Sequence, residues 1–224
     1  PGAIKISADE EQRRVIPLIK EIKNNSNLKA KISLDTLNLS TMKIGEENGV
    51  DIINDISGFA DAENISFISK KKTPIIVMHM QNEPKTMQQN PQYDFSPIDI
   101  FKILCEKIKV LLKLGVRESN IVIDPGIGFG KNLSHNLEIL NYLSLFHGLG
   151  VPILIGVSRK SLIADITIHG YKSLGINKKI IDASNRLSGS ISFAIHGYNN
   201  GIQIIRTHDV FETKQAIFCQ ESIS

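Results

Sequence analysis

Short apolar runs alternate along this chain with longer segments whose apolar residues recur at helical spacing. Six of the short runs are rich in Ile, Val and Leu, and each stops at polar residues. Runs of this length and composition are typical of strands covered on both faces, as in parallel sheets. The six predicted strands cover residues 31–34, 50–53, 74–78, 121–123, 152–157 and 201–205.

The segments between these runs predict helices. They cover residues 9–23, 40–48, 62–70, 97–114, 133–146, 182–198 and 210–218, and Ser7 or Asp9 is the expected N-cap of the first. Two longer stretches, 81–97 and 167–179, are predicted to be loops. Strands that alternate with helices indicate βαβ units and a parallel sheet.

Polar residues gather at the C-terminal end of nearly every predicted strand, which favours an α/β fold of the (β/α)8 barrel type with its site on that face. Such a barrel has eight strands, and the chain begins at Pro1 rather than at a methionine. We therefore expect two strands upstream of Pro1 and one domain, residues 1–224, that carries the last six strand–helix units. An open doubly wound sheet is the alternative, but its phosphate fingerprint is not visible.

The segment Ile121–Lys131 (I-V-I-D-P-G-I-G-F-G-K) carries the strongest local pattern. Asp124 stands at the tip of a predicted strand, and the alternate glycines after it let the loop backbone approach a ligand closely. A Walker A loop would need glycine and Ser/Thr where Pro125 and Asn132 stand, and a dinucleotide loop needs G-x-G-x-x-G spacing. We expect Asp124 to face a ligand of another kind; the alternative is an aspartate that only closes a turn.

Composition narrows the function classes. The net charge of +3 over 224 residues, the absence of Trp and the lack of a basic stripe argue against a nucleic-acid partner. No apolar run approaches the length of a membrane span. Cys105 and Cys219 are not clustered, which fits a reducing compartment, so we expect a cytoplasmic protein.

Seven motifs, in order, resemble those of the dihydropteroate synthase family. Each string is weak alone, but seven in the same order through essentially the whole chain make a specific signal. They are S-L-D-T (33–36), I-I-N-D-I-S-G (52–58), V-M-H-M (77–80), P-K-T-M-Q (84–88), D-P-G-I-G-F-G-K (124–131), G-V-S-R-K-S (156–161) and R-T-H-D-V (206–210).

The resemblance implies a (β/α)8 transferase that joins p-aminobenzoate to 7,8-dihydropterin-6-ylmethyl diphosphate. Its products are 7,8-dihydropteroate, a folate precursor, and diphosphate. It also implies a homodimer, inhibition by sulfonamides, and Mg²⁺ bound through the substrate diphosphate. The family's asparagine associated with Mg²⁺ would lie upstream of Pro1, so we expect no metal ligand in this chain. Some relatives are fused to the pyrophosphokinase that makes their substrate.

By the same resemblance, Asp35, Asn54 and Asp124 bind the pterin. A carboxylate can accept two parallel N–H bonds from an aminopyrimidine edge, and an amide offers both a donor and an acceptor. The alternative for each of these residues is that it caps the helix that follows.

Phe129, Lys160 and Ser161 are expected beside p-aminobenzoate. Phe129 would form an apolar wall, Lys160 would also contact the pterin carbonyl, and Ser161 would hold the carboxylate near a helix N-terminus. Arg206 and His208 alternate with Thr207, so their side chains should share one side and could hold the diphosphate. The resemblance makes Lys160, Arg206 and His208 the expected catalytic residues.

His79 stands between two methionines on a predicted buried strand, and we expect a satisfied core histidine rather than a catalytic one. Two competing functions share the pterin-binding residues. One is a pterin-dependent methyltransferase-like barrel, against which the G-V-S-R-K-S string and the Arg-x-His pair argue. The other is a pterin-binding module without catalysis.

Overall fold

The computed structural model describes residues 6–82, 86–177 and 180–223. All six predicted strands are confirmed, and four of them end on a polar residue that the sequence marked. The strands are β1 (Ser33–Asp35), β2 (Ile52–Asp55), β3 (Ile75–Met78), β4 (Ile121–Asp124), β5 (Leu154–Gly156) and β6 (Ile204–Arg206).

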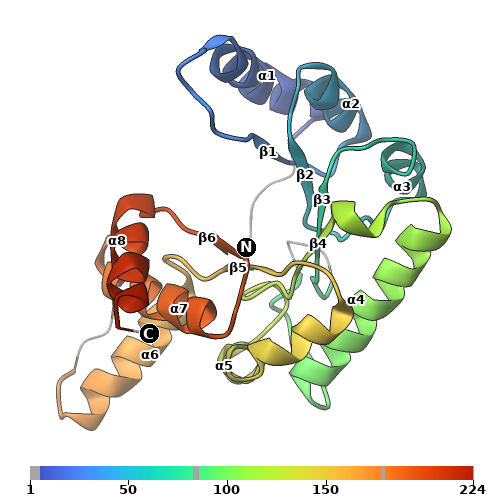
Figure 1. Ribbon diagram of the computed structural model, residues 1–224. Coiled ribbons are helices and arrows are strands. Elements are labelled where there is room, and N and C mark those ends of the chain that lie inside the picture. Colours follow the sequence, from blue (N-terminus) through green and yellow to red (C-terminus); the bar gives the residue numbers. More distant parts are fainter. Residues whose placement is uncertain (1–5, 83–85, 178–179, 224) are drawn as a thin grey trace.

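The strands stand side by side in chain order, and every pair is parallel. β1 to β4 form one sheet, β5 pairs with β6, and a parallel bridge between Ile123 and Ile153 joins the two groups. Arg206 Nη2 lies 3.4 Å from Asp35 Oδ2, so the tips of the last and the first described strand approach each other. The row of strands therefore curls as in a barrel, whereas a doubly wound sheet reverses its strand order (Figure 1).

Helices follow the strands and lie on the outside of the row (Figure 1). Ser7 caps the first one, as predicted, because its Oγ accepts a hydrogen bond from Glu10 N at 3.2 Å. The helices are α1 (Ala8–Asn24), α2 (Leu39–Glu47), α3 (Ala62–Ile68), α4 (Ser96–Lys113), α5 (Leu133–Asn141), α6 (Ser161–Ser173), α7 (Leu187–Asn199) and α8 (Val210–Glu221), with short 3-10 helices at Glu118–Asn120, Leu143–Leu149 and Ala183–Arg186.

The predicted loop at 167–179 was wrong over its first half, because α6 extends to Ser173. Its sequence mixes β-branched residues with a glycine, and the helix is docked by the buried residues Leu162, Ile163 and Ala164. The helix predicted at 133–146 is divided, since α5 ends at Asn141 and a 3-10 helix continues from Leu143. In the predicted loop at 81–97, the described residues before Ser96 form turns and bends only.

One hydrophobic cluster fills the space between strands and helices. It runs from Ile19 on α1 to Ile202 before β6, and Ile53, Ile75 and Ile121 on successive strands are fully buried within it. Burial on both sides of these strands explains why they read as continuous apolar runs. Among the helices of the described residues, none has both the length and the apolar character needed to cross a membrane.

Candidate active site

The polar residues that sequence analysis selected lie at one end of the strand row. Asp35, Asn54, Asp124 and Arg206 belong to the C-terminal ends of β1, β2, β4 and β6. The C-terminal ends of parallel strands share one edge, and α/β proteins bind ligands at that edge. Phe129, Lys160, Ser161 and His208 belong to the segments that leave the same ends of β4, β5 and β6.

Asp124 is a buried carboxylate with one oxygen still available. Its side chain is 6% exposed, and Oδ1 accepts a hydrogen bond from Gly126 N at 2.7 Å. Oδ2 accepts no hydrogen bond from the described residues, and Asn132 rather than Asp124 caps α5. Burial raises the pKa of Asp124, while the charges of Lys160, Lys131 and Arg206 and the Gly126 N–H lower it. The helix-capping alternative is therefore wrong for this residue, whereas the turn-closing hydrogen bond from Gly126 N to Asp124 is present.

Asn54 carries an orphaned oxygen. The residue is 8% exposed, and its Oδ1 is the one buried side-chain nitrogen or oxygen without a hydrogen-bond partner in the part of the chain that the structure describes. A buried carbonyl without a donor costs about 1–3 kcal/mol. An N–H group of a bound heterocycle would remove that cost.

Asp35 does not cap α2. The N-cap of that helix is Asn38, whose N–H bonds Thr36 Oγ1 at 3.0 Å. The Asp35 carboxylate instead faces the Arg206 guanidinium. Burial raises the pKa of Asp35, and Arg206 and Asn54 lower it. The Asp35 carboxylate therefore lies at the strand tips, paired with Arg206, and not at the start of α2.

Lys160 lies over the loop that follows β4. Its Nζ donates to the Ile127 carbonyl and lies 4.8 Å from the centre of the Phe129 ring. Burial lowers the pKa of Lys160 to about 8, against the favourable charge of Asp124. Ser161 begins α6 and is exposed, so the predicted helix N-terminus beside it is confirmed.

Arg206 ends β6, and His208 lies two residues beyond the strand, so their shared side stays a prediction. Thr207, between them, has its Oγ1 3.1 Å from Thr213 Oγ1 on α8. Asp209, which could have paired with Arg206, binds Arg159 instead. Both basic side chains are exposed at the strand tips, where an anion can reach them.

Two polar residues at the site were missed by sequence analysis. Ser158 Oγ lies 2.9 Å from His208 Nδ1, and the Lys131 side chain is buried beneath the loop that leaves β4. Both residues stand inside motifs that the sequence did identify, G-V-S-R-K-S and D-P-G-I-G-F-G-K. Their contacts join segments about fifty residues apart, which spacing alone does not reveal.

His79 is a satisfied core residue, as predicted. It is 2% exposed, and its Nδ1 lies 2.9 Å from Lys131 Nζ. Burial, together with the charges of Lys131 and Lys107, lowers the pKa of His79 to about 2. The ring is therefore neutral at physiological pH.

The described residues form no group of three or more His, Cys, Asp or Glu side chains that could hold a metal ion. The charged neighbours of Asp35 are Arg206, Asp55 and Glu11, and those of Asp124 are the cations Lys160, Lys131 and Arg206. This donor set does not fit a metal held by the described side chains, so we derive no step through such an ion.

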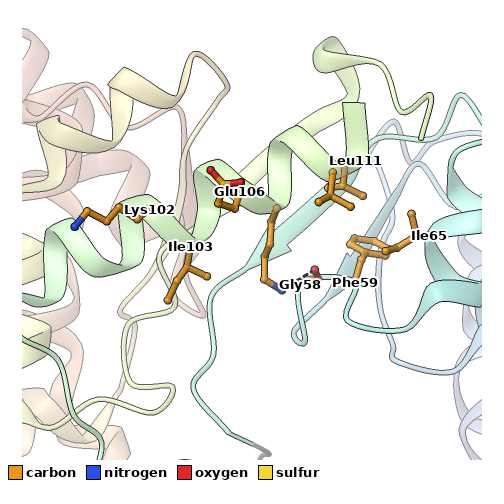
Figure 2. Close-up of a pocket in the computed structure, with 9 residues that line it drawn as sticks. Gly58, Phe59, Ile65, Lys102, Ile103, Glu106 and Leu111 are labelled. Atoms are coloured by element: carbon orange, nitrogen blue, oxygen red, sulfur yellow. Dashed lines mark hydrogen bonds between the residues drawn. The ribbon is translucent and has the colours of Figure 1, made fainter. Parts of the chain in front are cut away.

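An apolar groove of about 450 Å³ lies apart from the strand tips, between α4 and the segment that joins β2 to α3. Figure 2 shows Leu111 of α4 beside Phe59 and Ile65, with Lys102, Ile103 and Glu106 further along the same helix. The lining combines apolar side chains with the charged residues Lys102, Glu106 and Lys107. Polar groups that could orient a reactive substrate converge at the strand tips and not here.

Comparison with known proteins agrees with this geometry. Residues 1–208 match the family model described as pterin binding enzyme. The chain is 36% identical over 217 residues to the dihydropteroate synthase of Escherichia coli strain K12, which covers 97% of this chain and 72% of that protein.

Solved structures give the same result. The dihydropteroate synthase of Yersinia pestis in a sulfonamide drug complex has a TM-score of 0.88 and 33% identity, covering 100% of this chain and 76% of the other. That of Xanthomonas albilineans in complex with 7,8-dihydropteroate has a TM-score of 0.85 and 28% identity, covering 97% and 77%. This chain therefore belongs to the pterin-binding enzyme family and, within it, to the dihydropteroate synthases.

Proposed function

We propose that this chain condenses 7,8-dihydropterin-6-ylmethyl diphosphate with p-aminobenzoate to give 7,8-dihydropteroate and diphosphate. The observation that carries the proposal is the unpaired Asn54 Oδ1, buried at the same strand edge as the available oxygen of Asp124. These groups can accept N–H bonds from a flat, donor-rich ring, and a pterin has such an edge.

The pterin ring is held by groups from several strand tips. Asp124 accepts from the aminopyrimidine edge, Asn54 and Asp35 meet the ring from β2 and β1, and the Lys160 ammonium donates to the pterin carbonyl. The buried position of Asp124 and Asn54 supports this assignment, because water is kept from competing for their hydrogen bonds.

The p-aminobenzoate lies between the loop after β4 and the start of α6. Phe129 gives its ring an apolar wall, and the contact of Lys160 with the Phe129 ring places the ammonium at that wall. Ser161 and the N-terminus of α6 bind the carboxylate, since a helix N-terminus favours an anion.

Arg206 and His208 bind the diphosphate as it departs. The C–O bond to diphosphate breaks first, and the dihydropterin nitrogens delocalise the positive charge left on the methylene. The aniline nitrogen of p-aminobenzoate then forms the C–N bond and loses a proton. Catalysis comes from positioning and from stabilising the departing anion, without a covalent enzyme intermediate. Mg²⁺, bound through the substrate diphosphate, would add positive charge to that anion.

The remaining expectations stay predictions. We infer that residues 1–224 act as one domain, because a single hydrophobic cluster links its elements. A homodimer, a cytoplasmic location, sulfonamide sensitivity and fusion to a pyrophosphokinase also stay predictions, drawn from the family resemblance.

The test is diphosphate release with and without p-aminobenzoate, together with calorimetric binding of 6-hydroxymethylpterin. We expect release that depends on p-aminobenzoate, no pterin binding by Asp124→Ala, and pterin binding without turnover by Arg206→Ala. Pterin binding by the wild type without release would favour a binding module, and methyl transfer from methyltetrahydrofolate would favour the methyltransferase. Unchanged pterin affinity in Asp124→Ala would contradict the site assignment.

A further inference from the structure

The loop that leaves β4 is held at every backbone carbonyl from Gly126 to Gly130. Each carbonyl accepts a hydrogen bond from a side chain of the described part of the chain. The donors are Lys131 Nζ to Gly126 O at 2.8 Å, Lys160 Nζ to Ile127 O, Gln88 Nε2 to Gly128 O at 2.6 Å, Lys131 Nζ to Phe129 O at 2.8 Å and Tyr93 Oη to Gly130 O at 2.8 Å. Lys131 is the donor that binds two of them.

Lys131 is a buried ammonium, 2% exposed. Its Nζ also lies 2.9 Å from His79 Nδ1 and 3.4 Å from His79 O, so the acceptors around it are three backbone carbonyls and the imidazole. None of the ion pairs among the described residues includes Lys131. A buried charge is costly unless its hydrogen bonds are complete and an opposite charge lies near. Burial lowers the pKa of Lys131 well below its usual value, the charge of Asp124 raises it, and the charge of Lys160 lowers it.

Gly126 connects Lys131 with Asp124. Its N–H donates to Asp124 Oδ1 at 2.7 Å, and its carbonyl accepts from Lys131 Nζ at 2.8 Å. Gly126 has φ +71°, and a Cβ there would lie 1.9 Å from His79 O. Backbone from the end of β3 and the ammonium thus fix the same residue from two sides.

His79, which directly follows β3, contacts both Lys131 and the backbone of Asp124. Because its Nδ1 accepts from the ammonium, the ring proton is on Nε2. Its backbone N–H donates to Asp124 O at 2.9 Å, which ties the two strand ends together. The charged groups that face Asp124 come from three elements, namely Lys131 in the loop, Lys160 after β5 and Arg206 on β6.

We propose that Lys131 is a positioning residue for Asp124, because its side chain fixes the loop whose Gly126 N–H binds one oxygen of the buried carboxylate. This inference rests on the proposed function, since it assumes that Asp124 binds the pterin. Lys131 itself touches no substrate in this role. It acts through Gly126 by hydrogen bonding and through its charge.

Lys131→Met tests the inference, because methionine keeps the apolar length and removes the charge and its hydrogen bonds. The measurement is the Kd of 6-hydroxymethylpterin by calorimetry from about pH 5 to pH 8. We expect Kd at neutral pH to rise roughly 10- to 100-fold. The acid limb of binding should also move to higher pH, because Asp124 loses a neighbouring positive charge and is protonated more readily. The binding stoichiometry should stay near one.

Lys107→Met is the matched control. Lys107 is also a lysine whose pKa burial lowers, and its Nζ donates to Ser57 O and Gly58 O at 2.9 Å. Its Nζ holds the turn after β2, near Asp55, and among the described residues it donates to no carbonyl of the loop that follows β4. We expect Lys107→Met to lower the thermal midpoint while leaving the pterin Kd and its acid limb unchanged.

A role in stability alone would give Lys131→Met a lower thermal midpoint with the wild-type Kd and acid limb, and that result would overturn the inference. If Lys131→Met does not fold, His79→Leu and His79→Gln replace it. Glutamine keeps an acceptor for the ammonium and leucine does not, so Gln should restore the affinity that Leu loses. Equal wild-type affinity in both would also overturn it. A wild-type chain that does not bind pterin would instead refute the proposed function.

Discussion

Ser158 determines which nitrogen of His208 carries the proton. Its Oγ accepts from the His208 backbone N–H at 3.2 Å, so the single hydroxyl hydrogen can point at His208 Nδ1, 2.9 Å away. A neutral imidazole that accepts at Nδ1 has its proton on Nε2. The ring can then donate from Nε2 to the departing diphosphate without first being protonated.

Ser158→Ala should therefore weaken turnover more than binding. Without the hydroxyl, His208 can turn or adopt the other tautomer, and we expect kcat to fall roughly 10- to 100-fold. The Kd of 6-hydroxymethylpterin should stay unchanged, because the pterin contacts are elsewhere. Diphosphate release and calorimetry measure the two effects, and Ser158→Thr, which keeps a hydroxyl, should recover part of the loss. A wild-type kcat in Ser158→Ala would exclude this role.

Lys160 makes pterin binding sensitive to alkaline pH. Burial lowers the pKa of its ammonium to about 8, so the donor is charged below that pH and neutral above it. We expect the affinity for 6-hydroxymethylpterin to fall as the pH rises through about 8. Lys160→Arg should remove this fall, because guanidinium stays charged. Titration of the ligand itself affects the affinity of the wild type and of Lys160→Arg equally, so only a difference between the two pH profiles reports on Lys160. Identical profiles would contradict the role of Lys160.

At the scale of a single element, the loop after β4 depends on glycine at one position, Gly126, where the backbone passes close to the His79 carbonyl. Gly126 and Gly175 both have a left-handed φ, +71° and +76°. A Cβ on Gly126 would meet the His79 carbonyl at 1.9 Å, whereas a Cβ on Gly175 would meet nothing within 4 Å. The two positions thus share the backbone conformation and differ in their surroundings.

Alanine substitutions at Gly126 and Gly175 separate the cost of the left-handed backbone conformation from the cost of the steric clash. Gly175→Ala should lower the free energy of unfolding by about 1 kcal/mol, the cost of a left-handed φ for a residue with a Cβ. Gly126→Ala should lower it by about 3 kcal/mol or more, because backbone must move, and should also weaken pterin binding. Urea unfolding and calorimetry measure both quantities. Equal losses of stability would mean that the loop can move away from β3 at little cost.

The six strands could be predicted from the sequence, whereas the helix α6 could not. A strand buried on both faces needs a short apolar run, and the runs before Asp35, Asn54 and Asp124 have that form. The α6 segment offers a weaker helical signal, because Ile, Thr and Gly lower helix propensity, and its packing decides the outcome.

The candidate site was predictable only as far as the strand ends. Asp35, Asn54, Asp124 and Arg206 each follow an apolar run directly, so their position at the edge comes from local sequence. The pairs that orient such residues do not, because Lys131 and His79 are 52 residues apart and Ser158 and His208 are 50 apart. Contacts of that range depend on the register of neighbouring strands, which no local pattern encodes.

For the molecule as a whole, the curl of the strand row brings the site together. Asp35 on β1 and Arg206 on β6 are 171 residues apart in sequence, yet their charged groups approach to 3.4 Å. The continuous apolar cluster beneath them includes fully buried residues of β2, β3 and β4. Burial of that surface gives the curl most of its stability, and the polar tips then meet as a consequence of it.

A double-mutant cycle with Asp35→Asn and Arg206→Gln tests this order of causes. The side chains are 43% and 58% exposed, so solvent screens their attraction, and their coupling in urea unfolding should stay below about 1 kcal/mol. Turnover should nevertheless fall severely in both Arg206 variants, because the proposed function assigns the departing diphosphate to Arg206. A coupling above about 2 kcal/mol would show that the pair itself holds the strand row closed, since exposed pairs do not reach that value. A small coupling together with a large loss of turnover would mean that the hydrophobic core sets the curl of the strand row. The Asp35–Arg206 pair would then contribute to catalysis and not to the fold.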